Sequence, residues 1–500
     1  MAFTRSVCIV GAGPSGLVAA KTFLQHGSYA VTVYEAADRV GGMWRAQPGE
    51  YGDKCSPEMK TNLSRFTVAF ADLSWSSVDL SDPVTGAPSP STPPMFPKAW
   101  QVGQYLEKYT EKFGLKSNIF FSRKVVNADI LDDMKTWQIS TYDSVTHQSD
   151  TQTFDYLVIA SGFFDEPGRS FDPSPGGNLD NIQHSSIFRD LSSLTQKPGK
   201  IAVIGGGISG SEAAAQAAFQ ISSAKNSPGK SKSVHAASKI YHIVNRPFYC
   251  LPRYLPQNPY KGSPQDANLA PTFLPLDLVL YNLSRRGEGE ISASISTVPP
   301  EKAKKGHDFM RSVIGGDQQE YRNSALVHTP DQTQYPGYCG ITDTYLEFVR
   351  SGLIVPVQGW VEKVEQKDDG NSFDIALQHN EPWSKKPGVR SLGTWRVCLL
   401  TYVRRRVSSR TSPASLRPLA TRSASTTCTT RRKVSSTPTH PALVYLSSLL
   451  AGPYFRTTQL SVLSDSMRGL TGGLWRCRHA SSLTLGSNLL LTLPILQELA

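Results

Sequence analysis

Three glycines near the start of the chain have the spacing of a nucleotide-binding turn. Residues 11–16 read Gly-Ala-Gly-Pro-Ser-Gly, and an acidic residue, Glu35, follows shortly after them. Gly11 permits a tight turn, Gly13 lets the backbone approach a pyrophosphate, and Gly16 lets a helix lie close to the preceding strand. A carboxylate at Glu35 can accept hydrogen bonds from ribose hydroxyls. The pattern predicts a dinucleotide site; an ordinary glycine-rich turn is the alternative.

A second turn of the same kind occupies residues 205–210, which read Gly-Gly-Gly-Ile-Ser-Gly. The strand expected after it ends in Asn245-Arg246 and not in an acid. A carboxylate there would suit a free ribose hydroxyl, whereas an arginine suits a 2′-phosphate. This difference predicts NADPH rather than NADH at the second turn. The alternative is that Arg246 is a solvated charge at a strand end.

Both turns need a strand before them and a helix after them. Apolar runs and helical periodicity predict strands at 6–10, 31–34, 200–204 and 240–244, and helices at 17–26 and 211–220. Each helix would direct unpaired N–H groups and a partial positive charge toward the phosphates. The arrangement predicts an α/β fold with two Rossmann-like dinucleotide-binding domains.

Further motifs stand between the two turns. Gly41-Gly42-Met43-Trp44 and Thr61-Asn62 follow Glu35 in the chain. With these motifs the chain resembles the flavin-containing monooxygenases, the class B FAD/NADPH enzymes, and their Baeyer–Villiger relatives, over residues 1 to about 396. The resemblance implies an FAD domain with an inserted NADPH domain. It also implies that Asn62 reaches the flavin and the nicotinamide near the reactive carbon, and that the backbone at Val125 holds the FAD adenine. A turn or capping role is the alternative for Asn62.

The site residues expected from the motifs and the resemblance fall into two sets. Those for FAD are Gly11, Ala12, Gly13, Pro14, Ser15, Gly16, Glu35, Gly42, Met43, Trp44, Thr61, Asn62 and Val125, with Asn62 also catalytic. Those for NADPH are Gly205, Gly206, Gly207, Ile208, Ser209, Gly210 and Arg246. We expect no metal site.

The resemblance also implies the reaction. NADPH reduces FAD, the reduced flavin adds dioxygen as a hydroperoxide, and one oxygen atom passes to a small organic substrate. Similar chains occur in fungal small-molecule pathways, so we expect a fungal-type oxidoreductase of secondary metabolism. The alternatives are an inactive or FAD-deficient remnant, an NADPH oxidase that releases peroxide, and a flavin reductase; a disulfide reductase would need paired cysteines beside the flavin, and Cys55 stands alone.

A histidine motif in the expected interdomain linker matches the family in part. The family's signature is FxGxxxHxxx(F/Y), and His184 and Phe188 match its second half. Asn178 and Asp180 stand where the phenylalanine and the glycine should be. A role in coupling domain movement to catalysis and an ordinary surface histidine are both open.

Charge and cysteine usage exclude several classes of protein. Residues 401–500 contain 12 Arg and 1 Lys against 2 acidic residues, so the net charge of +11 belongs to this tail. The neutral body and the lack of aromatics between the arginines argue against nucleic-acid binding. The 7 cysteines show no CxxC spacing, which argues against a disulfide framework, a zinc site and a redox dithiol. We expect a cytoplasmic protein with no transmembrane segment.

The expected domain order follows from these motifs. It is an FAD domain at 1–165, a linker at 166–199, an NADPH domain at 200–330, an incomplete return to the FAD domain at 331–396, and a tail at 397–500. The family's last apolar strand, which runs into a glycine turn and closes the flavin domain, has no match after about Arg396. The tail holds 16 Ser and 14 Thr, so we expect poor order and a frame-shifted or mis-spliced origin. A continuous reading frame in the transcript across codons 380–410 would refute that origin.

Overall fold

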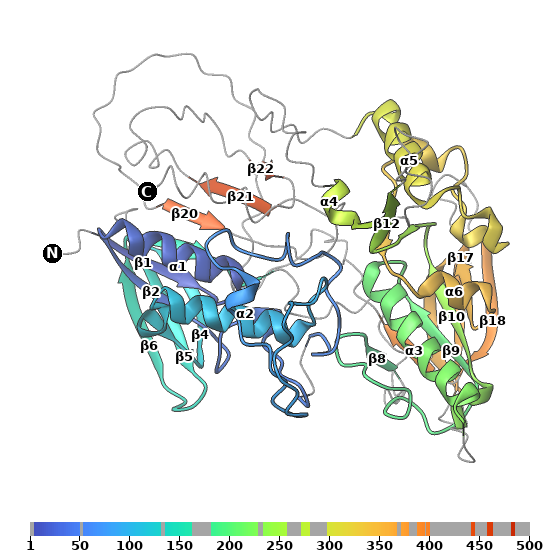
Figure 1. The fold of residues 1–500 in the computed structure, drawn as a ribbon, viewed down its shortest axis with the longest axis horizontal. Coiled ribbons are helices and arrows are strands. Elements are labelled where there is room, and N and C mark those ends of the chain that lie inside the picture. The colour runs from blue at the N-terminus through green and yellow to red at the C-terminus, as the bar shows by residue number, and fades with distance from the viewer. Residues whose placement is uncertain are drawn as a thin grey trace.

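The computed structural model describes thirteen stretches of the chain. They are residues 5–50, 54–131, 136–162, 182–228, 234–257, 272–280, 298–367, 372–379, 388–395, 397–400, 442–445, 458–463 and 482–485. These residues form two units, each built on a mainly parallel sheet (Figure 1). The predicted α/β class with two dinucleotide-type units is confirmed. No helix within the described stretches has both the length and the hydropathy that a membrane span requires.

The first unit contains a seven-stranded sheet in the order β22-β21-β20-β7-β1-β2-β3. Its strands are β1 (Arg5–Val10), β2 (Tyr29–Tyr34), β3 (Ile119–Phe120), β7 (Tyr156–Ile159), β20 (Ala442–Tyr445), β21 (Thr458–Leu463) and β22 (Ser482–Leu485). The strands from β3 to β20 run parallel, and β21 and β22 continue the sheet antiparallel. The carboxyl ends of β1 and β2 therefore lie side by side and place Gly11 next to Glu35.

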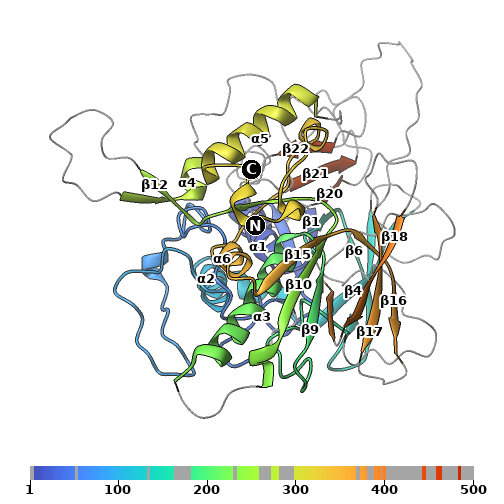
Figure 2. The ribbon, with the colours of Figure 1, turned by 90° about the vertical axis from the view of Figure 1, so that its right-hand side faces the viewer.

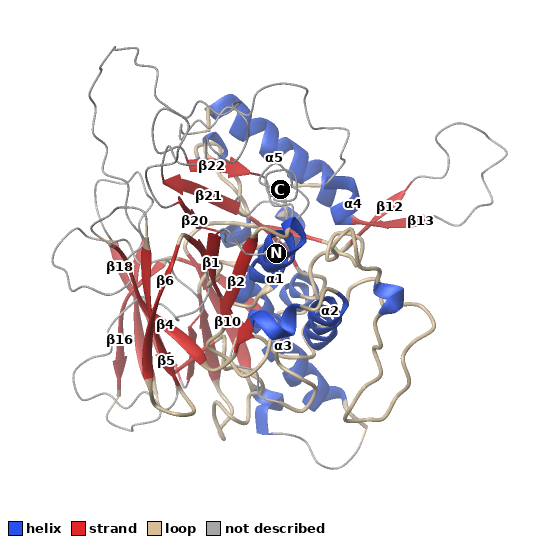
Figure 3. Cartoon of the chain, turned by 90° about the vertical axis from the view of Figure 1, so that its left-hand side faces the viewer, coloured by secondary structure: helices blue, strands red, loops and turns tan. Residues whose placement is uncertain are grey.

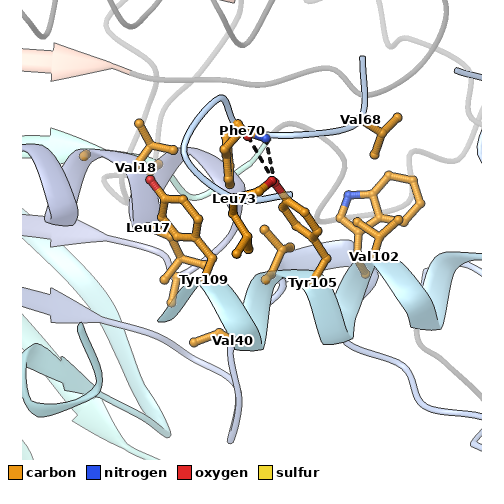
Figure 4. Packing of buried hydrophobic residues seen from close by; sticks show 14 of the residues in the cluster. Leu17, Val18, Val40, Val68, Phe70, Leu73, Val102, Tyr105 and Tyr109 are labelled. Atoms are coloured by element: carbon orange, nitrogen blue, oxygen red, sulfur yellow. Dashed lines mark hydrogen bonds between the residues drawn. The ribbon is translucent and has the colours of Figure 1, made fainter. Parts of the chain in front are cut away.

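Helices and a meander cover opposite faces of this sheet. On one face lie α1 (Pro14–His26) and α2 (Ala99–Lys112), and on the other lies the antiparallel meander of β4 (Arg123–Ile130), β5 (Trp137–Asp143) and β6 (Ser149–Phe154). Tyr105 and Tyr109 of α2 pack with Phe70 against Leu17 of α1 (Figure 4). The Tyr105 hydroxyl donates to the Leu73 carbonyl at 2.7 Å and accepts from the Phe70 N–H at 2.8 Å, which fixes the loop that follows Asn62.

The second unit repeats this layering (Figure 2). Its sheet has the order β15-β10-β9-β19-β8, from β8 (Ile182–His184), β9 (Lys200–Ile204), β10 (Lys239–Val244), β15 (Ile354–Gln358) and β19 (Val397–Leu400). One face packs against α3 (Ile208–Asn226) and α6 (Tyr345–Arg350). The other face packs against the meander of β16 (Trp360–Gln366), β17 (Phe373–His379) and β18 (Gly388–Trp395). The second nucleotide-type unit predicted around residues 200–244 is confirmed.

Shorter elements connect the two units. They are β11 (Tyr249–Leu251), β14 (Cys339–Ile341), β12 (Tyr254–Gln257), β13 (Thr272–Pro275), α4 (Leu276–Leu280) and α5 (Pro300–Ile314). The 3₁₀ turns are η1 (Gly42–Trp44), η2 (Trp75–Ser77), η3 (Leu115–Asn118), η4 (Val234–Ala237), η7 (Gln319–Tyr321), η8 (Ser324–Leu326) and η9 (Gln332–Gln334). Strands β12 and β13 project from the body as a two-stranded ribbon (Figure 3).

The structure describes four short strands in the C-terminal tail, which was expected to be poorly ordered. Val397–Leu400 inserts between β9 and β8 as β19, and Ala442–Tyr445 pairs in parallel with β7 as β20. Both are short apolar runs, which suit a strand buried between neighbours. Strands β19 to β22 therefore lie within the tail, while its bounds, its origin and the missing closing strand stay predictions. The other residues after 400 lie outside the described residues.

Candidate functional site

The three glycines of the first turn have different roles. Gly11 and Gly16 permit the turn itself, and Gly13 leaves one side of it open. Gly11 has φ of 102°, and a Cβ there would lie 2.5 Å from the Ala160 carbonyl oxygen. A Cβ on Gly16 would lie 1.9 Å from the Gly11 carbonyl oxygen. Both positions therefore require glycine for the turn itself. At Gly13 a Cβ would meet only the Gly42 Cα, at 3.7 Å, so the protein leaves this side of the turn open.

Helix α1 begins at this open side. Gly13 is its N-cap, Pro14 occupies the first turn, and no side chain caps the backbone N–H groups. A helix N-terminus without a side-chain cap leaves donors and a partial positive charge available to an anion. Residues Ala12, Gly13 and Ser15 thus form a cradle that fits a pyrophosphate.

Glu35 lies at the same turn and is nearly buried. Its Oε2 accepts from the Ala12 N–H at 2.6 Å, and its Oε1 accepts from the Ala37 N–H at 2.8 Å. A carboxylate has about four acceptor positions, so two backbone donors leave capacity for the hydroxyls of a ribose. The Arg123 N–H donates to the Glu35 carbonyl at 2.9 Å, so β4, which carries Val125, begins beside this site.

The Gly41–Trp44 loop lies against the first turn. The Gly41 N–H donates to the Ala12 carbonyl at 3.0 Å, and both Gly41 and Gly42 have positive φ. Trp44 is buried, and the Cys55 thiol donates to the Met43 carbonyl at 3.0 Å. The structure therefore brings together the expected FAD residues from Gly11 to Trp44.

Asn62 lies at the junction of the two units. The Thr61 N–H donates to the Pro97 carbonyl at 2.9 Å, which ties the loop to the start of α2. The Asn62 Oδ1 accepts from Nη2 of Arg253, a residue of the connecting elements between β11 and β12, at 3.1 Å. Asn62 therefore contacts a side chain 191 residues away, while its role toward the flavin stays a prediction.

The second turn repeats the geometry of the first. Gly205 has φ of 124°, and a Cβ on Gly210 would lie 1.9 Å from the Gly205 carbonyl oxygen. Gly207 is the N-cap of α3, again without a side-chain cap. Ile208 and Ser209 open the helix beside it, and Arg246 is exposed just beyond the end of β10. The expected NADPH residues are thus grouped at one edge of the sheet.

Tyr338 also belongs to this group, although no local motif in the sequence marks it. Its hydroxyl accepts from the Ile208 N–H at 3.2 Å across a separation of 130 residues. A Cβ on Gly207 would lie 3.2 Å from the same hydroxyl. The Arg246 guanidinium carbon lies 5.3 Å from the centre of the Tyr338 ring. Tyr338 therefore links the start of α3 to the arginine expected to bind the 2′-phosphate.

A buried histidine supports the second turn from behind. His242 is fully buried; its Nε2 donates to the Gly205 carbonyl at 2.8 Å, and its Nδ1 accepts from the Tyr345 hydroxyl at 2.7 Å. These two hydrogen bonds fit the neutral ring, and burial away from water is what disfavours the charged ring. Burial lowers the pKa of His242 from 6.5 to about 4.

His242 should make stability depend on pH. Between pH 6.5 and about 4 the unfolded chain binds a proton at this residue that the folded chain does not, so stability falls as pH falls through this range. The full loss is about 3 kcal/mol. In urea unfolding followed from pH 7 to pH 4.5, His242→Gln should show a shallower decline than wild type. Equal slopes for the two proteins would contradict the assignment.

His184 and Phe188 are not ordinary surface residues. The His184 Nδ1 accepts from the Ser186 N–H at 3.2 Å, and burial lowers the pKa of His184. Phe188 is buried in the core of the second unit. Asn178 and Asp180 lie outside the described residues, so coupling to domain movement stays a prediction.

The cysteines of the described part show no redox or metal arrangement. Cys8, Cys55, Cys250 and Cys339 are free and buried there. Burial raises the pKa of Cys55 to about 11, which disfavours the nucleophilic thiolate. Within the same residues, no group of three or more potential metal ligands occurs.

The chain matches one family model and is similar to several curated monooxygenases. Residues 5–246 match the family model described as pyridine nucleotide-disulphide oxidoreductase. Flavin-containing monooxygenase FMO GS-OX-like 9 of Arabidopsis thaliana is 27% identical over 33% of this chain and 38% of its own length. Trimethylamine monooxygenase of Methylocella silvestris is 27% identical over 42% of this chain and 47% of its own. The chain therefore spans less than half of the length of these curated relatives.

A solved structure overlaps more of the chain but more loosely. Cyclohexanone monooxygenase from Rhodococcus sp. Phi1, bound to NADP⁺, covers 80% of this chain and 70% of its own. The sequence identity is 15% and the TM-score is 0.48.

Proposed function

We propose that this chain is an FAD- and NADPH-dependent monooxygenase. Its residues 5–246 match the family model described as pyridine nucleotide-disulphide oxidoreductase, and the chain is similar to flavin-containing monooxygenases. It would insert one oxygen atom from dioxygen into a small organic substrate. The observation that carries the proposal is the pair of uncapped glycine turns, one beside Glu35 and the other beside Arg246. Asn62 lies where the two units meet.

The residues of the first unit suit FAD. The open side of Gly13 and the start of α1 would receive the pyrophosphate, and Glu35 would accept from the ribose. FAD bound there would carry electrons from NADPH to dioxygen and deliver one oxygen atom to the substrate. Met43, Trp44 and Thr61 would hold the flavin end and exclude water, and Asn62 would offer its carboxamide beside the reacting atoms.

The residues of the second unit suit NADPH. The start of α3 would receive its pyrophosphate, and Arg246 would pair with the 2′-phosphate through charge-assisted hydrogen bonds. Tyr338 already contacts both of these groups, so its hydroxyl is placed to bind the phosphates or to move aside for them. We further propose a role in secondary metabolism, because of the resemblance to the flavin-containing monooxygenases. We also propose that the protein acts in the cytoplasm, because its cysteines are scattered along the chain.

Two alternatives make different predictions. An NADPH oxidase would release peroxide in proportion to consumed NADPH, whatever substrate is present. A remnant without FAD would purify colourless and would not bind added flavin. Disulfide reduction is disfavoured because Cys55 is protonated, buried and bonded to the Met43 carbonyl.

The test is NADPH consumption in the presence of FAD, with peroxide and oxygenated product measured together. Amines, sulfides, ketones and polyenes should be screened, because nitrogen or sulfur oxygenation, Baeyer–Villiger insertion and epoxidation all use this layout. We expect at least one class to raise NADPH consumption and to yield product in place of peroxide. If NADPH is consumed but no class of substrate yields an oxygenated product, oxygen transfer is refuted.

A further inference from the structure

Arg253 connects the two units at the position of Asn62. It lies between β11 and β12, and only 11% of its side chain is exposed. Its Nη2 donates to the Asn62 Oδ1 at 3.1 Å, and its Nε donates to the Thr61 carbonyl at 3.2 Å. One guanidinium therefore holds a side chain and a neighbouring backbone group of the same loop.

Asp343 holds the guanidinium from the other side. The Asp343 Oδ2 accepts from Arg253 Nη1 at 2.5 Å, and its Oδ1 accepts from the Arg253 backbone N–H at 3.0 Å. Burial raises the pKa of the nearby Glu212, although the Arg253 charge opposes that shift. Asp343 is therefore the carboxylate that balances the Arg253 charge and fixes its planar group.

The chemistry of the guanidinium fixes the orientation of the Asn62 carboxamide. Arginine can only donate hydrogen bonds, so the atom that faces it must be Oδ1 and not Nδ2. The Nδ2 group is then turned away from Arg253 with its donors directed elsewhere. Without Arg253 the two ends of the carboxamide could exchange by rotation.

A second charged side chain from the same segment holds the next turn of this loop. Asp277 of α4 is buried, and its Oδ2 accepts from the Ser64 N–H at 3.0 Å, the Ser64 hydroxyl at 2.7 Å and the Thr67 hydroxyl at 2.6 Å. Residues 61–67 of the first unit are thus held at both ends by side chains that follow β11. The orientation of Asn62 therefore depends on how the connecting elements that follow β11 pack against this loop.

We propose that Arg253 is a positioning residue that orients the Asn62 carboxamide and makes that orientation depend on the contact between residues 61–67 and the connecting elements that follow β11. This inference rests on the proposed function for the role of Asn62 in oxygen transfer. Arg253 itself acts through Asn62.

The first test replaces Arg253 and separates turnover from nucleotide binding. Arg253→Met should lower kcat for oxygen transfer by about 10- to 100-fold, the range expected for one charge-assisted hydrogen bond. It should also raise peroxide release, while KM for NADPH changes less than about threefold. Arg253→Lys keeps the charge without the planar fork and should give an intermediate kcat. The control is Arg350→Met, which removes an exposed arginine paired with Glu347 on α6 and should behave as wild type. Wild-type coupling and kcat in Arg253→Met would overturn the proposal.

A double-mutant cycle with Asn62 shows whether Arg253 acts through it. The pair Arg253→Met and Asn62→Ala should be no slower than Asn62→Ala alone, whereas independent roles would multiply the two losses. The same cycle is run on urea unfolding midpoints, which need no activity. If wild type shows no NADPH-driven turnover, the proposed function fails, and the unfolding cycle decides alone. Non-additive midpoint shifts support the contact, and additive shifts overturn it.

Discussion

Replacement of Gly13 by alanine is expected to remove FAD from a chain that still folds. A Cβ at this position meets only the Gly42 Cα, at the ordinary contact distance of 3.7 Å, so the turn itself tolerates it. The same Cβ occupies the place where a pyrophosphate must approach the backbone. Loss of the backbone contacts with the pyrophosphate should weaken FAD binding by about 100-fold. Flavin absorbance per purified chain and the thermal unfolding temperature measure the two effects separately.

Two further glycine variants are the controls for this result. Gly306→Ala changes a helix position of α5 with nothing within 4 Å, so flavin content should stay at the wild-type level. Gly16→Ala places a Cβ 1.9 Å from the Gly11 carbonyl oxygen and should lose both flavin and stability. A Gly13→Ala protein with full flavin content would contradict the site.

Replacement of Arg246 by alanine is expected to abolish the preference for NADPH over NADH. A charge-assisted pair with a phosphate is worth about 1.5–3 kcal/mol, which corresponds to about a 10- to 100-fold rise in KM for NADPH. The KM for NADH should change little, because NADH has no 2′-phosphate. Steady-state kinetics with both nucleotides measure the ratio.

The control for Arg246 is Lys304→Ala, which removes an exposed positive charge from α5. It should leave both KM values unchanged. Equal changes for NADPH and NADH in Arg246→Ala would show that the arginine does not read the 2′-phosphate.

Local features of the site were predictable from the sequence because they depend on short-range geometry. Gly11 and Gly205 have the positive φ that the turn spacing requires, and Gly16 and Gly210 lie against the turn that precedes them. Glu35 is at the end of β2 because a parallel βαβ unit places that residue beside the first turn. These outcomes follow from the period of apolar residues and from glycine chemistry alone.

The contacts between residues far apart in the chain were not predictable in this way. Arg253 meets Asn62 across 191 residues and Tyr338 meets Ile208 across 130 residues, and no local period marks such partners. The strands β19 and β20 were not predicted, because each consists of only four apolar residues. So short a run in a polar, arginine-rich stretch does not by itself indicate a strand. Their partners, β9 and β7, lie far away in the chain.

The most direct measurement is anaerobic mixing of the purified protein with NADPH while the visible flavin band is followed. The account predicts a yellow protein with about one FAD per chain. Its flavin band should bleach with NADPH far faster than with NADH, and the colour should return when oxygen is admitted. A colourless protein that takes up no added FAD, or a bound flavin that NADPH does not reduce, would contradict the account.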